Sequence, residues 1–258
     1  MEDKFLKVAK QAALEAGKVV TKYAGRSQTL NLKYDDKSDF VTNADLASER
    51  IIKQILSNNF PTHNIIAEEE TRINKNSKYT WIIDPLDGTI SFSATLPFFS
   101  VSIGLLENQK PILGVIFDAF SKNLYTARFG RGTDLNGKPV RVSKQKDLEA
   151  ALVDVDTGHR ARRQQKIDSY ISRMLMQVGY LYSFGPAAGI LGQLAKGNLD
   201  AYIAQGWSWD FVAGAVIVRE AGGTVTDFQG KEPDWTQDRL SIVASNGLIH
   251  DQILKALR

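Results

Sequence analysis

The 258-residue sequence contains no cysteine, only three histidines and no apolar run long enough to span a membrane. The lack of cysteine excludes disulfides, thiolate catalysis and zinc bound by cysteine. His63, His159 and His250 lie far apart and show no metal-ligand spacing. With no membrane-spanning run and no signal-peptide pattern, we expect a cytoplasmic protein without a membrane partner. Any metal chemistry must therefore use oxygen ligands.

The chain has an ordinary globular composition, with 43% hydrophobic residues, 24% charged residues and a net charge of +3. Its length is sufficient to bury a full core, in one large domain or in two tightly packed halves. A mildly basic balance does not by itself indicate a nucleic-acid partner, and we expect none. We interpret the basic run 159–166 as a solvated helix face, with contact to an anion or polymer as the alternative.

The segment 81–89 concentrates chemically useful residues. A short apolar run leads into two carboxylates, a glycine and a hydroxyl, in the order Asp84-Pro85-Leu86-Asp87-Gly88-Thr89. We expect a strand to stop at the proline, which lacks an N–H, and the glycine to permit a tight turn. The two aspartates would then face one point, where both ionise only if a cation such as Mg²⁺ or Mn²⁺ lies between them. The alternative interpretation is a solvated surface turn.

Carboxylates also occur at the end of another apolar run and at the expected start of a helix. Three glutamates, 68–70, directly follow the apolar run 63–67, and Asp210 lies where a helix should begin. Taken alone, such residues are usually a solvated loop and a helix cap. In this order, however, the glutamates, the segment 84–89, the segment 209–214 and the pair Gly222-Gly223 resemble the inositol monophosphatase family of Mg²⁺-dependent, Li⁺-sensitive phosphatases. The resemblance extends over nearly the whole chain.

The resemblance implies a set of metal ligands. Glu68, Asp84 and the carbonyl of Leu86 would bind a first Mg²⁺, and Asp84, Asp87 and Asp210 a second, so that Asp84 bridges the two ions. A third, weakly held ion would lie near Glu68, and Mn²⁺ could replace Mg²⁺. The carboxylates of Asp87 and Asp210 would also border the substrate.

The resemblance also implies the catalytic groups. A metal-activated water would attack the phosphorus directly, and its proton would be drawn toward Thr89, which Asp45 supports; Glu68 would assist through its metal ion. The backbone N–H groups of Gly88 and Thr89, at the expected start of a helix, would bind phosphate oxygens. Lys37 matches a family lysine near the site.

Hydrophobic periodicity outlines the fold. The pattern predicts helices over 5–23 and from about 42 to 56, and then an antiparallel meander from 65 to 142 with a hairpin turn at Asn136-Gly137. Within it we expect strands at 81–84, 99–106, 112–117, 124–129 and 140–142. After Lys144, expected strands at 152–155, 201–203, 224–227 and 241–244 alternate with helices near 167–178, 187–194, 211–221 and 248–257.

The resemblance implies a mixed α/β fold, the layered α/β/α/β/α sandwich of the inositol monophosphatase and fructose-1,6-bisphosphatase type. We expect one compact unit with a soft internal boundary. Residues 1–145 would form an α+β half with an antiparallel sheet and most metal ligands. Residues 146–258 would form an α/β half that contributes Asp210.

The residues that should bind the alcohol half of the substrate depart from the family pattern. An acidic residue usually stands seven positions before the metal-binding aspartate, where this chain has Ile203, and Pro186 replaces a serine or threonine. We expect a homodimeric phosphomonoesterase for inositol 1-phosphate or a related small sugar or polyol phosphate, with weak discrimination among alcohols. The alternatives are a sugar bisphosphatase, a 3′-phosphonucleotide phosphatase and a regulatory, transcription-associated binding protein.

Overall fold

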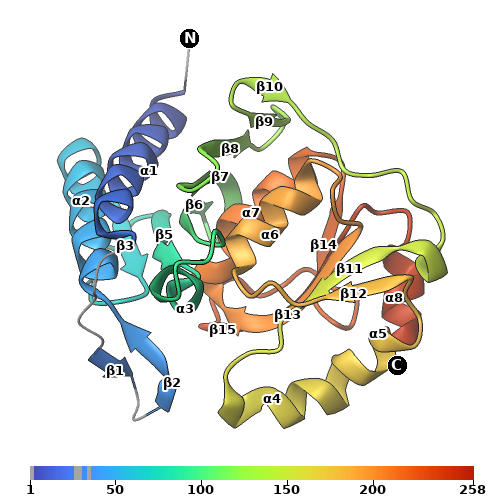
Figure 1. The fold of residues 1–258 in the computed structure, drawn as a ribbon. Helices are drawn as coiled ribbons and strands as arrows, with labels where there is room; N and C mark the ends of the chain where they lie inside the picture. Colours follow the sequence, from blue (N-terminus) through green and yellow to red (C-terminus); the bar gives the residue numbers. More distant parts are fainter. Residues whose placement is uncertain (1–2, 26–30, 34–35) are drawn as a thin grey trace.

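The structure, a computed structural model, describes residues 3–25, 31–33 and 36–258. Its helices and sheets alternate in five layers, α/β/α/β/α, as the resemblance implied (Figure 1). No helix in the described ranges is both long and apolar enough to cross a membrane.

Helices α1 (Lys4–Tyr23) and α2 (Asn43–Asn59) form the first outer layer. Small and β-branched residues at helical spacing, such as Ala12, Ala16 and Val20, bury one face of α1 against the first sheet. Helix α2 begins with the expected capping box, in which the side chain of Thr42 accepts a bond from a backbone N–H and the Asp45 carboxylate accepts one from the Thr42 N–H. A two-stranded ribbon, β1 (Asn31–Lys33) and β2 (Asp36–Val41), precedes α2.

The first sheet has the order β10-β9-β8-β7-β6-β5-β3-β4 in the described part of the chain. Its strands are β3 (Asn64–Ala67), β4 (Arg72–Ile73), β5 (Tyr79–Asp87), β6 (Ser100–Glu107), β7 (Lys110–Asp118), β8 (Asn123–Arg128), β9 (Thr133–Leu135) and β10 (Lys138–Pro139).

Three sequence expectations about this sheet need correction. Strands β3 and β5 pair in parallel, so the sheet is not a pure meander. Strand β5 does not stop at Pro85: it continues to Asp87, and a shift of register between Asp84 and Asp87 absorbs the missing proline N–H. Residues 140–142 form no strand, because the hairpin is shorter and pairs β9 with β10 around Asn136 and Gly137, both at positive φ.

The second sheet has the order β12-β11-β13-β15-β14. Its strands are β11 (Leu152–Val155), β12 (Tyr180–Tyr182), β13 (Ala201–Trp207), β14 (Thr224–Thr226) and β15 (Arg239–Ser245). The helical segments of this half are a 3₁₀ turn (Leu148–Ala150), α4 (Arg160–Lys166), a π-helical turn (Ile167–Ile171), α5 (Ser172–Leu175), α6 (Ala187–Ala195), α7 (Ser208–Glu220) and α8 (His250–Ala256). Strand β12 was not expected from the sequence.

Helices α6 and α7 lie between the two sheets and hold them together (Figure 1). Their buried side chains share one cluster with Tyr125 of the first sheet and with Tyr202 and Ile242 of the second. The outer helices α4, α5 and α8 cover the other face of the second sheet. The chain passes from the first sheet to the second between β10 and β11. The division of the chain near residue 145 stays a prediction.

Candidate active site

The bulge at the end of β5 presents the first two carboxylates. Asp84 and Asp87 are buried, and the Leu86 N–H donates to Asp84 Oδ1 over 3.0 Å. This local bond, together with the shift of register, turns the strand at the proline.

Asp87 connects the two halves of the molecule. Its carboxylate accepts bonds from the hydroxyl of Ser100 (2.9 Å) and from the N–H groups of Ala187 (2.9 Å) and Gly189 (3.1 Å). The last two belong to the first turn of α6, where N–H groups lack helical partners and favour a negative charge. Pro186 caps this helix without a side-chain hydrogen bond.

Glu68 follows β3 beside the same strand end. Its N–H donates to Ile83 O over 3.1 Å, which places the start of the acidic loop against β5. The buried Glu49 carboxylate holds the rest of this loop, accepting bonds of 2.7–2.9 Å from the N–H groups of residues 69–71. Sequence reasoning missed Glu49, although its position four residues after Asp45 puts both on one face of α2.

Asp210 lies in the first turn of α7, which begins at Ser208 and not at Phe211 as the sequence suggested. The residue as a whole is half-buried, and its carboxylate accepts a 2.7 Å bond from the Trp207 N–H. A Cβ atom at Gly206 would lie 2.4 Å from Asp210 Oδ2, so only glycine lets the strand pass this close to the carboxylate.

Thr89 and Asp45 form the expected pair. Thr89 Oγ1 lies 2.9 Å from Asp45 Oδ1 and 3.0 Å from the carbonyl oxygen of Leu86. Helix α3 (Thr89–Ser93) starts here after Gly88, whose φ is 88° and whose hypothetical Cβ would lie 2.6 Å from Phe98 O. Glycine at this turn therefore satisfies both a left-handed backbone and a close approach.

Burial and mutual repulsion raise the pKa of every aspartate in this group. Burial is the largest cause for Asp84 and Asp210, whose pKa values lie well above 3.8, and the charges of Glu68 and of the neighbouring aspartates raise them further. Burial also raises the pKa of Asp87 to about 6 against the lowering effect of its hydrogen bonds, and that of Asp45 to about 6 against the bonds from Thr42. No described lysine or arginine pairs with Asp84, Asp87 or Asp210.

The donor set fits divalent cations chemically. All candidate ligands are oxygens, and no described lysine or arginine offsets the mutual repulsion of Asp84, Asp87 and Asp210. Across residues 3–25, 31–33 and 36–258, no three acidic or histidine side chains are placed so that, as they stand, they could hold one metal ion. The carboxylates instead accept bonds from backbone N–H groups, as Asp84 does from Leu86 and Asp210 from Trp207.

These pKa shifts predict how the metal-free protein responds to pH. The pKa values of Asp45 and Asp87 are about 6 in the folded state against an ordinary 3.8, so the folded protein binds more protons than the unfolded chain between those values. The resulting stabilisation is present at low pH and is lost as the pH rises through about 6, at about 1.4 kcal/mol for each pKa unit.

Calorimetry in EDTA should therefore give a higher Tm at pH 5 than at pH 8. Asp87→Asn should reduce this difference, whereas Glu149→Gln, at an exposed position in the 3₁₀ turn, should leave it unchanged. A wild-type protein that melts higher at pH 8 in EDTA contradicts the raised pKa values.

Some candidates lie away from the site. Ile203 is fully buried in the cluster beneath the outer helices, so its side chain cannot contact a substrate. The side chain of Lys37 lies outside the described residues. Glu220, the last residue of α7, has a structural role, because its carboxylate accepts bonds from the N–H groups of residues 130–132. The basic run is not wholly solvated, because Lys166 is buried and forms an ion pair with Asp156.

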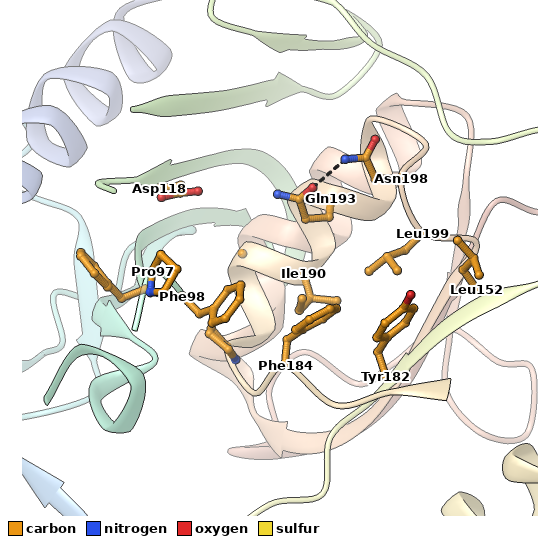
Figure 2. Close-up of a pocket in the computed structure, with 13 residues that line it drawn as sticks. Pro97, Phe98, Asp118, Leu152, Tyr182, Phe184, Ile190, Gln193, Asn198 and Leu199 are labelled. Carbon is orange, nitrogen blue, oxygen red and sulfur yellow. Dashed lines mark hydrogen bonds between the residues drawn. The ribbon is translucent and has the colours of Figure 1, made fainter. Parts of the chain in front are cut away.

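A cavity of about 340 Å³ lies beside these carboxylates and not among them. Figure 2 shows Phe98, Phe184 and Tyr182 in a row along one side of it, with Asp118 and Gln193 on the other. The candidate ligands do not line this cavity, although Pro186 and Gly189 at the start of α6 do. The cavity therefore adjoins the candidate metal ligands and is separate from them.

Known proteins resemble the chain along its whole length. The model of the inositol monophosphatase family matches residues 1–258. Inositol monophosphatase 3 of Solanum lycopersicum is 38% identical over 99% of this chain and 97% of its own. The fructose-1,6-bisphosphatase/inositol-1-monophosphatase of Aquifex aeolicus is 35% identical over 99% and 96%, respectively.

Solved structures confirm the fold. The extragenic suppressor protein SuhB of Bartonella henselae superposes with a TM-score of 0.92 at 32% identity over 99% of both chains. The inositol monophosphatase of Thermotoga maritima gives a TM-score of 0.86 at 32% identity, over 99% of this chain and 97% of its own. With the family match over all its residues and these relatives, the chain belongs to the inositol monophosphatase family and is an enzyme of the phosphatase class.

Proposed function

We propose that the protein is a Mg²⁺-dependent phosphomonoesterase that hydrolyses inositol 1-phosphate or a related small sugar or polyol phosphate. The observation that supports this most is the hydroxyl of Thr89, held between Asp45 and the Leu86 carbonyl, at the end of a strand that carries Asp84 and Asp87. A proton-accepting pair beside oxygen ligands suits direct attack by an activated water.

Two or three ions, with Mn²⁺ as a substitute for Mg²⁺, would be held by Glu68, Asp84, the Leu86 carbonyl, Asp87 and Asp210. When bound, such cations neutralise charge on a phosphate dianion and make a coordinated water more acidic. The protein supplies the rigid placement: Glu49 orders the loop behind Glu68, and the first turn of α6 orients Asp87.

Thr89 would guide the water and relay its proton, accepting it on Oγ1 while passing the hydroxyl proton to Asp45 Oδ1. Its hydroxyl has one proton, which it donates to Asp45 Oδ1 or to Leu86 O, so its lone pairs remain able to accept a bond from water. The pKa of Asp45, raised to about 6 by burial, makes this carboxylate a better proton acceptor than an ordinary aspartate while keeping it ionised at neutral pH.

The start of α3 would bind the phosphate. The N–H groups of Gly88 and Thr89 stand at the first turn, where a helix offers donors without internal partners. Pro186 packs against this turn, with Cγ 3.0 Å from the position of a hypothetical Cβ on Gly88, and so restricts the adjoining space.

A panel of phosphomonoesters assayed with Mg²⁺ or Mn²⁺, and with excess EDTA, tests the proposal. We expect metal-dependent release of phosphate from inositol 1-phosphate and at least one related polyol phosphate. No release from any ester with either metal would sink the proposal, and undiminished release in EDTA would sink the proposed role of the carboxylates.

Lithium should inhibit the enzyme uncompetitively with respect to substrate. The reason is the proposed second ion site at Asp84, Asp87 and Asp210, where Li⁺ would compete after hydrolysis and before phosphate departs. Steady-state kinetics at several Li⁺ concentrations provide the measurement. Purely competitive inhibition contradicts this order of events.

We propose further that the protein is a homodimer. Four aromatic side chains form a continuous row, with ring centroids 5.4 Å apart for Phe98 and Phe184, 4.9 Å for Phe184 and Tyr182, and 4.6 Å for Tyr182 and Tyr180. Figure 2 shows the first three of them. Leu152, exposed next to this row, enlarges the apolar area. Such patches are typical of subunit contacts, and light scattering on the purified protein decides between monomer and dimer.

A further inference from the structure

Two tryptophans and two arginines form a stack next to the candidate metal ligands Glu68 and Asp210. The rings of Trp207 and Trp209 lie 4.9 Å apart and nearly parallel, at 12°. The guanidinium of Arg72 lies over Trp209, 5.1 Å from the ring centroid, and that of Arg239 lies over Trp207 at 3.9 Å. Guanidinium groups in this arrangement are attracted to the ring face and lose much of their freedom of movement.

The stack touches two segments that carry candidate metal ligands. The Trp207 N–H donates to Asp210. From the other side, Arg72 Nη1 donates to the carbonyl of Ala67, the residue before Glu68, and to that of Thr71 over 3.3 Å. Arg72 is therefore fixed at the rim of the site, between the acidic loop and the start of α7.

Arg72 forms no ion pair with any described residue, although its loop contains three glutamates. Only Nη1 donates to the protein, so the N–H groups on Nε and Nη2 have no acceptor among the described atoms. The side chain is exposed to solvent. Beneath it, Nε1 of the buried Trp209 also lacks a partner.

The guanidinium of Arg72 is already positioned by the protein, and its edge with the Nε and Nη2 N–H groups is unoccupied by described acceptors. Such an edge is suited to bind a phosphate or carboxylate through two hydrogen bonds. Because stacking and the two carbonyls already restrict its movement, little further entropy is lost when an anion binds. A role for Arg72 only in packing would not require its free edge to face solvent beside the ligand-bearing segments.

We propose that Arg72 binds a second anionic group on the substrate, a phosphate or a carboxylate on the alcohol half. The inference rests on the proposed phosphatase function and adds to it a preference, among the phosphate esters hydrolysed, for those that carry another negative group. It also assigns recognition of the alcohol half to a described residue, since Ile203 is buried elsewhere and Pro186 offers no hydroxyl.

Fructose 1,6-bisphosphate and fructose 1-phosphate provide a matched pair, because they differ only in the second phosphate. Wild type should have the higher kcat/KM for the bisphosphate. Arg72→Gln should lower kcat/KM for the bisphosphate by about tenfold to hundredfold, mainly through KM, and for the monophosphate by about threefold at most. Arg72→Lys should fall between, because it keeps the charge and loses the planar edge.

Lys75→Gln is the matched control, because it removes one positive charge from an exposed position three residues away and should leave both substrates unaffected. Equal losses on both substrates in Arg72→Gln would mean that Arg72 binds the reacting phosphate or supports the fold, and would overturn the inference. So would a wild type without preference for the bisphosphate, or unaltered kinetics in Arg72→Gln. A wild type inactive on every phosphomonoester would instead reject the proposed function, which keeps the two failures distinct.

Discussion

Asp84→Asn should abolish phosphatase activity, with a fall in kcat of about a thousandfold or more. Asp84 is the buried carboxylate on the β5 bulge that we propose is shared by two ions, so the substitution weakens both sites at once. A loss of about 4 kcal/mol of transition-state stabilisation corresponds to this factor, and metal ions supply several kcal/mol in such reactions. Phosphate release with saturating Mg²⁺ is the measurement.

The variant should remain folded and in EDTA should melt at a higher temperature than wild type. Burial and the neighbouring acids disfavour ionised Asp84 when no cation is present, and asparagine removes that charge while it can still accept the bond from the Leu86 N–H. Asp251→Asn, an exposed change of the same kind on α8, should keep full activity. Full turnover by purified Asp84→Asn protein would falsify the proposed site.

Thr89→Ala should lower kcat by about a hundredfold to ten-thousandfold with a smaller change in KM. The methyl side chain removes the hydroxyl that Asp45 and the Leu86 carbonyl hold in place, and general acid–base groups contribute factors of this size. Thr89→Ser should recover most of the activity, since it restores the hydroxyl. If Thr89→Ala retains wild-type kcat with saturating Mg²⁺, the hydroxyl has no part in proton transfer.

A double-substitution cycle separates this role from a merely structural one. Asp45→Asn alone should reduce kcat, and combined with Thr89→Ala it should cost little more than the worse single change, because the two groups act as one unit. Additive losses would indicate that Asp45 acts independently, for instance through its cap on α2. Melting curves of all variants control for that cap.

Local sequence signals predicted most of the elements. Helical spacing marked α1, and the capping box at Thr42 and Asp45 marked the start of α2, because both depend on residues three or four apart. The turn at Asn136-Gly137 was correct for the same reason. Pro85 was misread, since whether a strand stops or bulges at a proline depends on its neighbours in the sheet.

The sequence by itself determined the family, the layered fold and the set of candidate residues, because oxygen-rich segments at strand and helix ends identify themselves by residue type and order. Only the tertiary structure decided which residues support them. Glu49, the first turn of α6 around Asp87 and the stack above Asp210 are contacts between segments distant in the chain. Periodicity along a chain indicates which face of an element is buried, but it does not indicate which elements pack together. Because side chains from different elements meet only through that packing, the sequence placed Ile203 at the site and gave no role to Arg72.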